Sequence, residues 1–490
     1  MASPVPSFDS LDQIYDPTAL AKQGERYNKL IEQFENTHGR KAEFVVRSPG
    51  RVNLIGEHID YCGFGVLPMA IERDVIIVGA TTEDDTKVRV ANSNSTKYPT
   101  REFDYEGKEK VVTIDSSMLE WSNYFKCGYK GMLEKFQLDK PKGLFLLVDG
   151  TVPAGGGLSS SAAFVCASAL AVVTANELTI SKTELTEIAI VAERNVGVNS
   201  GGMDQSASVL SEKDYALHVE FVPKLHTSLV PLPKTSPKLA FIIANTLVTA
   251  DKFVTAPRNY NLRVVETRMA ALYLSKVLNL PSVDSLKEVY DLYYKDSTLN
   301  EVEKFSDLLS KAIEQFPSDN TNGNGYTLQE VSDMLDISVN ELNEKYMTRF
   351  PVETDYFRLV QRTKHVLSEA SRVIEFHKAC ESSDSSLKVL GDLMNASQDS
   401  CRDLFMCSCP EIDQVCEIAR KNGSFGSRLS GAGWGGSTVH LTTEDNVANL
   451  ISAIKNDFYR KVYPNITEEE LDDAIISTKP CGGAARFTGF

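Results

Sequence analysis

The pattern of apolar and polar positions divides the chain into a first half that mixes strands with helices and a second half that is rich in helices. Short apolar, β-branched runs bounded by charges, Pro or Gly predict strands at residues 43–46, 75–78, 144–148 and 238–245. Apolar residues then recur at intervals of three and four, which predicts amphipathic helices at residues 263–278, 356–375 and 409–421. We therefore expect a mixed α/β protein.

A proline-rich segment separates the two halves. Three of the seven residues from Pro231 to Pro237 are proline, and such a segment continues neither a helix nor a strand. The chain has 490 residues, too many for one ordinary core. We therefore predict an N-terminal domain over residues 1–232 and a C-terminal domain over residues 233–490. Within the latter, residues 317–325 are predicted to form a surface loop.

The charge of the chain limits its partners. The chain has 51 Lys and Arg against 67 Asp and Glu, a formal net charge of −16. Such a charge opposes binding to nucleic acid and to anionic lipid, so we expect neither as a partner. Residues 1–12 contain no basic region followed by an apolar run, which predicts no signal peptide and a cytoplasmic protein. Residues 158–174 approach membrane length but are rich in Ser and Ala, which favours a packed helix.

Two other patterns suggest functions that their details disfavour. Cys401, Cys407, Cys409 and Cys416 cluster, but their spacing matches no zinc ribbon, so we expect no metal there. Residues 327–346 carry two capping boxes before apolar periodicity and resemble a helix-turn-helix. The second helix there is acidic, which argues against reading DNA.

A glycine- and serine-rich loop follows the predicted strand at 144–148. Residues 149–161 read Asp-Gly-Thr-Val-Pro-Ala-Gly-Gly-Gly-Leu-Ser-Ser-Ser and open into an Ala-rich helix. Glycines let backbone amides approach an anion, and the helix N-terminus adds partial positive charge, so the segment suits phosphate. It lacks the G-x-x-x-x-G-K-[ST] pattern of the Walker loop. A tight turn before a capped, buried helix is the alternative interpretation.

A second glycine motif, Gly431-Ala-Gly-Trp-Gly-Gly436, satisfies G-x-G-x-x-G. The residues after it alternate and are β-prone, whereas a dinucleotide site needs these glycines to open a helix. Protein-kinase catalytic motifs are also absent from the sequence. The motif is therefore either a tight turn or a second loop that closes over a ligand.

Two polar constellations suggest binding and proton-transfer chemistry. Residues 51–61 read Arg-Val-Asn-Leu-Ile-Gly-Glu-His-Ile-Asp-Tyr, and their charged groups offer the paired donors and acceptors that sugar hydroxyls need. A solvated turn with its own salt bridge is the alternative. Asp204 follows two glycines, eleven residues after Glu193. One of these carboxylates could hold a divalent metal ion and the other could take a proton.

Taken together, these segments resemble the galactokinases of the GHMP kinase superfamily. Residues 51–61 look like the galactokinase signature, residues 153–163 like the superfamily's ATP-binding motif, and residues 430–436 like its C-terminal glycine motif. The resemblance covers nearly the whole chain. It implies a GHMP kinase fold, in which two mixed α/β domains (α+β) hold ATP and sugar in the cleft between them.

The resemblance also assigns roles to residues of this chain. Asp204 and Arg51 are implied to be catalytic, with Asp204 at the anomeric hydroxyl. The residues implied to bind the sugar are Arg51, Glu57, His58, Asp60, Gly201, Asp204 and Tyr260. Those implied to bind ATP are Gly155, Gly156, Gly157, Leu158, Ser159, Ser160 and Ser161. Ser161 and Glu193 are implied to hold Mg²⁺.

The implied activity is phosphorylation of galactose by ATP at the anomeric hydroxyl, the first step of galactose catabolism. Two alternatives remain open. Ile59 and Cys62 replace the usual Thr and Asn of the signature, a variant that also suits N-acetylgalactosamine kinases. Related proteins sense galactose and ATP and bind a transcriptional regulator, but they lack a Ser-Ala pair that residues 159–163 retain. We expect a monomer, with a regulatory protein as a further partner if the chain also acts as a sensor.

Overall fold

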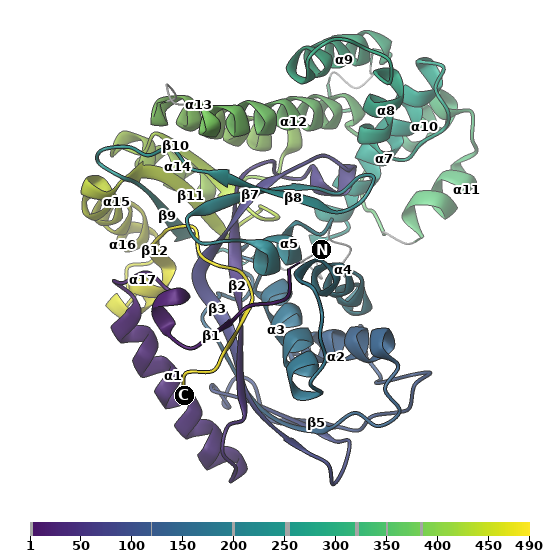
Figure 1. The fold of residues 1–490 in the computed structure, drawn as a ribbon. Helices are drawn as coiled ribbons and strands as arrows, with labels where there is room; N and C mark the ends of the chain where they lie inside the picture. Colours follow the sequence, from purple (N-terminus) through teal and green to yellow (C-terminus); the bar gives the residue numbers. More distant parts are fainter. Residues whose placement is uncertain are drawn as a thin grey trace.

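The computed structural model describes residues 3–118, 120–197, 201–249, 255–318, 323–348, 351–382 and 386–490. Part of the predicted loop at 317–325 therefore lies outside the described residues. Figure 1 shows a lower body built on a long twisted sheet and an upper body made mostly of helices.

A seven-stranded sheet organises the lower body, in the order β1-β13-β2-β3-β6-β4-β5. Its strands are β1 (Ser7–Phe8), β13 (Ala485–Phe487), β2 (Phe44–Ile55), β3 (Leu67–Thr82), β6 (Gly143–Gly150), β4 (Val88–Asn92) and β5 (Arg101–Phe103). The predicted strands at 43–46, 75–78 and 144–148 are thus confirmed within β2, β3 and β6.

Both faces of this sheet are buried, because successive strand side chains point to opposite faces and both sets are apolar. Ile76 and Val78 pack with the helix α1 (Leu20–His38) on one face, and Val75 and Ile77 join the main core on the other. That second face is covered by the helices α2 (Ser122–Phe136), α3 (Ser160–Ala175), α4 (Lys182–Glu193) and α5 (Met203–Leu210).

A four-stranded antiparallel sheet lies in the upper body, in the order β10-β11-β9-β12. Its strands are β10 (Gly426–Ser430), β11 (Ser437–Thr443), β9 (Leu239–Asn245) and β12 (Ile475–Thr478). Ile242 and Ala244 of β9 face one set of helices, α14 (Pro410–Lys421), α15 (Val447–Ile454) and α17 (Glu468–Ala474). The short helix α16 (Arg460–Val462) lies between α15 and α17 along the chain. Phe241 and Ile243 face the main core, toward α12 (Leu359–Glu381) and α13 (Leu387–Ser400).

The remaining elements extend the upper body. The hairpin β7 (Tyr215–Glu220) and β8 (His226–Pro231) precedes the predicted proline-rich boundary. The outer lobe contains α7 (Tyr260–Val277), α8 (Leu286–Tyr293), α9 (Glu301–Gln315), α10 (Leu328–Leu335) and α11 (Val339–Leu342) (Figure 1). The domain boundary at 232/233 stays a prediction. The C-terminal strand β13 returns to the sheet of the first half, where it pairs with β2.

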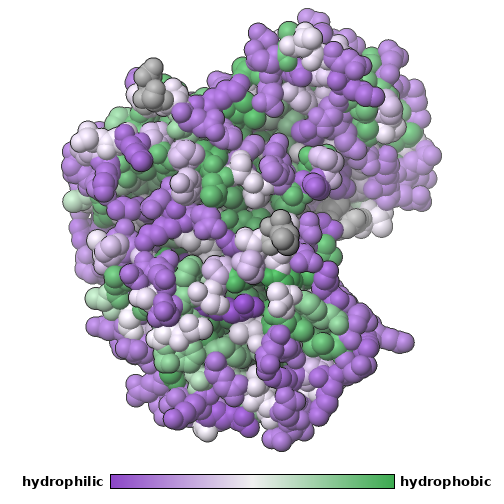
Figure 2. Space-filling view, in the orientation of Figure 1, coloured by the Kyte–Doolittle hydropathy of each residue, from purple (hydrophilic) through white to green (hydrophobic). Residues whose placement is uncertain are grey.

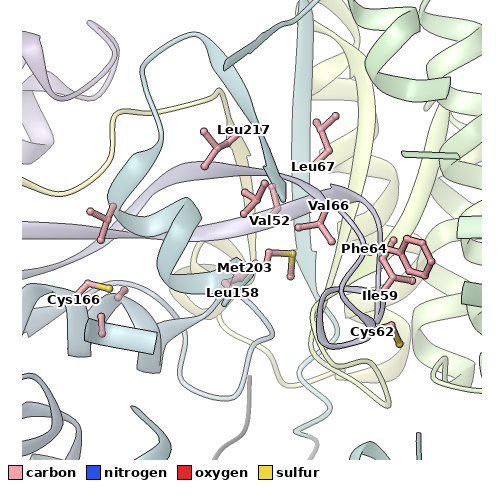
Figure 3. Close-up of a cluster of buried hydrophobic side chains, with 14 of the residues drawn as sticks. Val52, Ile59, Cys62, Phe64, Val66, Leu67, Leu158, Cys166, Met203 and Leu217 are labelled. Carbon is pink, nitrogen blue, oxygen red and sulfur yellow. The ribbon is translucent and has the colours of Figure 1, made fainter. Parts of the chain in front are cut away.

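The surface of the protein is mostly polar, and its interior is apolar. The visible face is largely hydrophilic, with smaller apolar patches between the polar residues (Figure 2). Apolar side chains at the end of the signature and just after it, such as Ile59, Phe64 and Val66, belong to one buried hydrophobic cluster (Figure 3). Across the described part of the chain, every helix is too short or too polar to cross a bilayer.

Candidate active site

A cavity of about 1420 Å³ lies between the two glycine motifs. Its wall includes seven of the residues implied by the resemblance, which are Arg51, Gly155, Gly157, Ser159, Ser160, Ser161 and Asp204. Ala432, Gly433, Gly435 and Gly436 of the second glycine motif line the same cavity. The second motif therefore lines the same cavity as the first motif.

The first glycine motif joins β6 to α3 as a strand–loop–helix unit. Gly155 and Gly157 have φ of +72° and +74°, a backbone conformation that favours glycine. A Cβ at Gly157 would lie 2.8 Å from the carbonyl oxygen of Ser430, so glycine is also needed for the close approach of the two motifs. The loop leads directly into α3, whose first amides, as at any helix N-terminus, have no partners within the helix. The arrangement is suited to holding a phosphate chain.

Arg51 and Asp204 form an ion pair on the cavity wall. Arg51 Nη2 lies 2.7 Å from Asp204 Oδ1, and Nε donates to the same oxygen at 2.8 Å. Arg51 Nη1 also donates to the carbonyl oxygen of Gly157 at 2.6 Å. One guanidinium therefore connects the carboxylate on α5 with the phosphate-suited loop, although 153 residues separate the acid and the base.

Glu57 is buried behind this cavity and is held by the upper body. Its Oε2 accepts from Arg428 Nη2 at 3.0 Å and from the amide of Gly431 at 3.1 Å. Burial raises the pKa of Glu57, and the charges of Arg428 and Arg51 oppose that effect. The solvated-turn alternative for this segment is wrong, because Glu57 is 3% exposed and its salt bridge reaches a distant strand.

His58 uses both of its ring nitrogens within the protein. Nε2 donates to the carbonyl oxygen of Ala432 at 2.9 Å, so Nδ1 is the nitrogen that accepts from the Tyr61 hydroxyl at 3.0 Å. Burial lowers the pKa of His58 to about 3, which keeps the ring neutral. His58 therefore connects the signature to the second glycine motif, and its predicted contact with sugar stays a prediction.

Asp60, Gly201 and Tyr260 lie close to one another. A Cβ at Gly201 would collide with Asp60 Oδ2, so glycine permits this approach. Burial, followed by the charge of Asp204, raises the pKa of Asp60 to about 7. Burial also raises the pKa of Tyr260, and the charges of Asp60 and Asp204 add to the effect. These couplings bring the predicted sugar residues into one electrostatic unit with Asp204.

Glu193 ends α4 and is buried. Gln205 Nε2, from the helix that carries Asp204, donates to Glu193 Oε2. Tyr124 lines the cavity. Burial raises the pKa of the Tyr124 phenol, and the negative charge of Glu193 raises it further. Lys182, at the other end of the same helix, pairs with Glu212 at 2.6 Å.

Several residues that the resemblance assigns to the site do not line the cavity. Among the described residues, the cavity wall omits Glu57, His58, Asp60, Gly156, Leu158, Glu193, Gly201 and Tyr260. Leu158 takes part through its backbone, since its carbonyl oxygen accepts from the Arg51 amide at 3.1 Å. The carbonyl oxygen of Gly156 accepts from Ser437 Oγ at 2.5 Å.

Comparison with known proteins decides the family. Residues 32–81 match the galactokinase galactose-binding signature, residues 123–212 the GHMP kinases N terminal domain, and residues 376–461 the GHMP kinases C terminal domain. The galactokinase of Saccharomyces cerevisiae is 42% identical over an alignment that covers 99% of this chain and 98% of that protein. The galactokinase of Schizosaccharomyces pombe is 40% identical, with 98% of each chain covered. The chain belongs to the galactokinase family.

Solved structures agree with this assignment. The structure of Lactococcus lactis galactokinase complexed with galactose has a TM-score of 0.70 and 27% identity, and covers 94% of this chain and 99% of its own. A mevalonate kinase of Methanococcus jannaschii has a TM-score of 0.54 at 14% identity, covering 89% of this chain and 98% of its own, which supports the fold alone. The predicted GHMP kinase fold is therefore confirmed, and the chain is a sugar kinase of the galactokinase family.

The galactokinase fold also uses residues that the sequence motifs did not single out. Arg428 of β10 is fully buried, and besides Glu57 it binds the carbonyl oxygen of Asn53 at 2.7 Å. The Asn53 amide in turn donates to Oγ of Ser430, the first residue of the C-terminal glycine motif, at 2.8 Å. A lone Arg between Ser427 and Leu429, in a strand-prone run, was the only signal in the sequence.

Proposed function

We propose that the protein transfers the γ-phosphoryl group of ATP to the anomeric hydroxyl of D-galactose, yielding galactose 1-phosphate and ADP. The observation that carries this proposal is the Arg51–Asp204 ion pair. It joins the phosphate-suited loop, through Gly157, to the residues of the galactose signature. A phosphoryl acceptor held at Asp204 would therefore lie beside the donor's phosphates.

The residues of the pair supply two parts of phosphoryl transfer. The Asp204 carboxylate accepts a hydrogen bond from the attacking hydroxyl, orients it and takes its proton as the new O–P bond forms. The Arg51 guanidinium stabilises the charge on the transferring group. Because Asp204 is bound to Arg51, orientation of the hydroxyl is a large part of its role.

The remaining residues fit the two substrates. The Gly155–Ser160 loop and the first turn of α3 bind the phosphates through backbone amides, and Ser159 Oγ is buried without a hydrogen-bond partner among the described residues. Aromatic side chains on the cavity wall, Tyr98, Trp121, Tyr124 and Phe164, suit a purine base. Asp60 and Tyr260, with Glu57, His58 and Gly201 behind them, surround the sugar.

Ser161 and Glu193 fit a magnesium ion in their chemistry. Hydroxyl and carboxylate oxygens are the ligands that Mg²⁺ prefers, together with water and phosphate. Gln205, which donates to Glu193, has its own Oε1 buried without a hydrogen-bond partner among the described residues, so a polar acceptor is available there. When bound, Mg²⁺ would neutralise charge on the phosphates. In the described part of the chain no group of three or more His, Cys, Asp or Glu side chains forms a protein-only metal site.

A reducing compartment such as the cytoplasm suits the chain. The nine cysteines are all free, and eight of them are buried. Free thiols in these numbers favour a reducing environment. The monomeric state and a regulatory protein partner stay predictions.

The proposal is tested by measuring ADP release from purified protein with ATP, Mg²⁺ and a panel of hexoses. We expect turnover with galactose and much less with N-acetylgalactosamine, because the Tyr260 phenol narrows the sugar pocket. Equal kcat/KM for the two sugars would instead support an N-acetylgalactosamine kinase. An unchanged ratio in Tyr260→Phe would show that Tyr260 does not cause the preference. Binding of galactose and ATP without turnover would support a sensor.

A further inference from the structure

A polar stripe on α12 is buried against the sugar signature. Arg362, His365 and Glu369 are separated by three and four residues and are 1%, 0% and 0% exposed. Side chains at this spacing share one face of a helix. Charged side chains are seldom fully buried unless they have specific partners. The stripe lies outside the three matched family segments, which end at residue 212 and resume at residue 376.

Glu369 binds the backbone of the turn at Gly56–Glu57, within the galactokinase signature. Its Oε1 accepts from the amides of Gly56 at 2.9 Å and Glu57 at 3.1 Å, and from Ser397 Oγ at 2.7 Å. Its Oε2 accepts from Arg372 Nε at 2.8 Å. The two carboxylate oxygens of Glu369 therefore bind different groups. One holds the turn, and the other is paired with a cation.

His365 binds the other side of the same residue. Its Nε2 donates to the carbonyl oxygen of Glu57 at 3.0 Å, and its Nδ1 accepts from Ser400 Oγ at 2.8 Å. Burial lowers the pKa of His365 to about 4, so the ring is neutral. Glu57 thus has both its N–H and its C=O fixed by side chains of α12.

The turn itself depends on this contact. Gly56 has φ of +100°, and a Cβ there would lie 2.9 Å from Val373 Cγ2 on α12. The Glu57 side chain leaves the turn on the other side, toward Arg428 and Gly431. A shift of the turn would move Glu57 and His58 together, and with them their contacts to the second glycine motif.

We propose that Glu369 is a positioning residue of the sugar site, with His365 as its helper. Its Oε1 holds the Gly56–Glu57 turn, and this fixes where Glu57 and His58 lie relative to the sugar. The inference rests on the proposed function, since it assigns the sugar site to this signature. Glu369 acts through the backbone of Glu57 and contacts neither substrate.

The test compares steady-state kinetics of the wild type, Glu369→Met, Glu369→Gln and Glu375→Met. The Met variant keeps the side chain's length but removes the acceptor from two buried amides. We expect its galactose KM to rise about tenfold or more, with the ATP KM within about threefold. The Gln variant keeps a carbonyl acceptor for the two amides, so it should restore the galactose KM to within about threefold. Glu375, on the same helix and bonded to Ser371, is the matched control and should behave as wild type.

Three outcomes would overturn the inference. The first is an unchanged galactose KM in Glu369→Met, and the second is an equal rise of the galactose KM and the ATP KM in that variant. The third is a galactose KM as high in Glu369→Gln as in Glu369→Met, which would make the Arg372 ion pair the source of the effect. If Glu369→Met does not fold, His365→Phe tests the same prediction, because Phe405 already packs on that ring at 4.3 Å between centroids. A wild type without activity on galactose would instead refute the proposed function.

Discussion

At the scale of single residues, the site consists of groups whose charge is set by their neighbours. Asp204 is paired with Arg51, and Glu57 is paired with Arg428. Asp60 forms no ion pair among the described residues, and its burial, followed by the charge of Asp204, raises its pKa. Asp74 is also buried, but the charges of Arg26 and Arg47 beside it lower its pKa. Asp60 therefore changes its charge near neutral pH.

The raised pKa of Asp60 predicts a pH dependence of sugar binding. Its pKa is about 7, so a fall in pH from 8 to 6 converts a mostly ionised carboxylate into a mostly neutral one. A neutral carboxyl is a weaker acceptor for sugar hydroxyls. We expect kcat/KM for galactose to fall severalfold over this range, with a midpoint near pH 7. Asp60→Asn should remove that inflection, and an inflection that persists in the variant would assign it to another group.

Glu193 gives a prediction about the metal. Glu193→Gln should raise the Mg²⁺ concentration for half-maximal activity by about tenfold or more, because a neutral amide is a poor ligand for Mg²⁺. The galactose KM should change little, since Glu193 lies on the side of Gln205 and Tyr124. Titrating activity against Mg²⁺ tests this. An unchanged curve would mean that Glu193 has a structural role only.

At the scale of elements, two glycine loops from different sheets meet backbone to backbone. Gly431 has φ of +95°, and a Cβ there would lie 2.5 Å from the carbonyl oxygen of Gly157. Ser437 Oγ also binds the carbonyl oxygen of Gly156. The ATP loop is therefore held in place by the turn between β10 and β11.

This contact predicts the effect of a single methyl group. Gly431→Ala should raise the ATP KM and destabilise the protein by about 1–3 kcal/mol, because the strained backbone and the collision both act at this position. Gly24→Ala on α1 is the control, since a Cβ there meets nothing within 4 Å. It should leave activity unchanged and stabilise slightly. Thermal unfolding and the ATP KM of both variants test this prediction. If Gly431→Ala has the stability and the ATP KM of the wild type, the two loops move independently.

The elements near the site could largely be predicted from local sequence. The loop before α3, the strand after the second glycine motif and the capping boxes at Thr327 and Ser338 are confirmed, because each depends on residues within one or two turns of chain. Glu369 and Arg428 could not be predicted in this way. Their partners in the signature are more than 300 residues away, and no local periodicity in the sequence indicates such a contact. The return of β13 to the first sheet was missed for the same reason.

At the scale of the whole molecule, buried neutral histidines predict sensitivity to acid. Burial lowers the pKa of His58 and His440 to about 3, and of His218 and His365 to about 4. Unfolded histidine titrates near 6.5, so below that pH the unfolded chain binds more protons than the folded one, and stability falls. Asp60 acts in the opposite direction, because its raised pKa favours the protonated folded state between about pH 4 and 7.

The destabilising effect of these four histidines on acidification outweighs the stabilising effect of Asp60. Between pH 7 and 5.5 we expect a loss of about 3 kcal/mol in the free energy of unfolding. Chemical denaturation at the two pH values measures it. A stability that is equal or higher at pH 5.5 would show that these histidines are protonated in the folded protein, against the burial that the structure gives them.

Product analysis tests the proposed phosphoryl transfer to galactose most directly. Purified protein is incubated with ATP, Mg²⁺ and galactose, and the products are followed by phosphorus NMR, with Asp204→Asn as the comparison. We expect galactose 1-phosphate and ADP in equal amounts from the wild type, and a rate lower by a factor of about 10²–10⁴ from the variant. Phosphate on another hydroxyl, no sugar phosphate at all, or a variant as fast as the wild type would contradict the proposal.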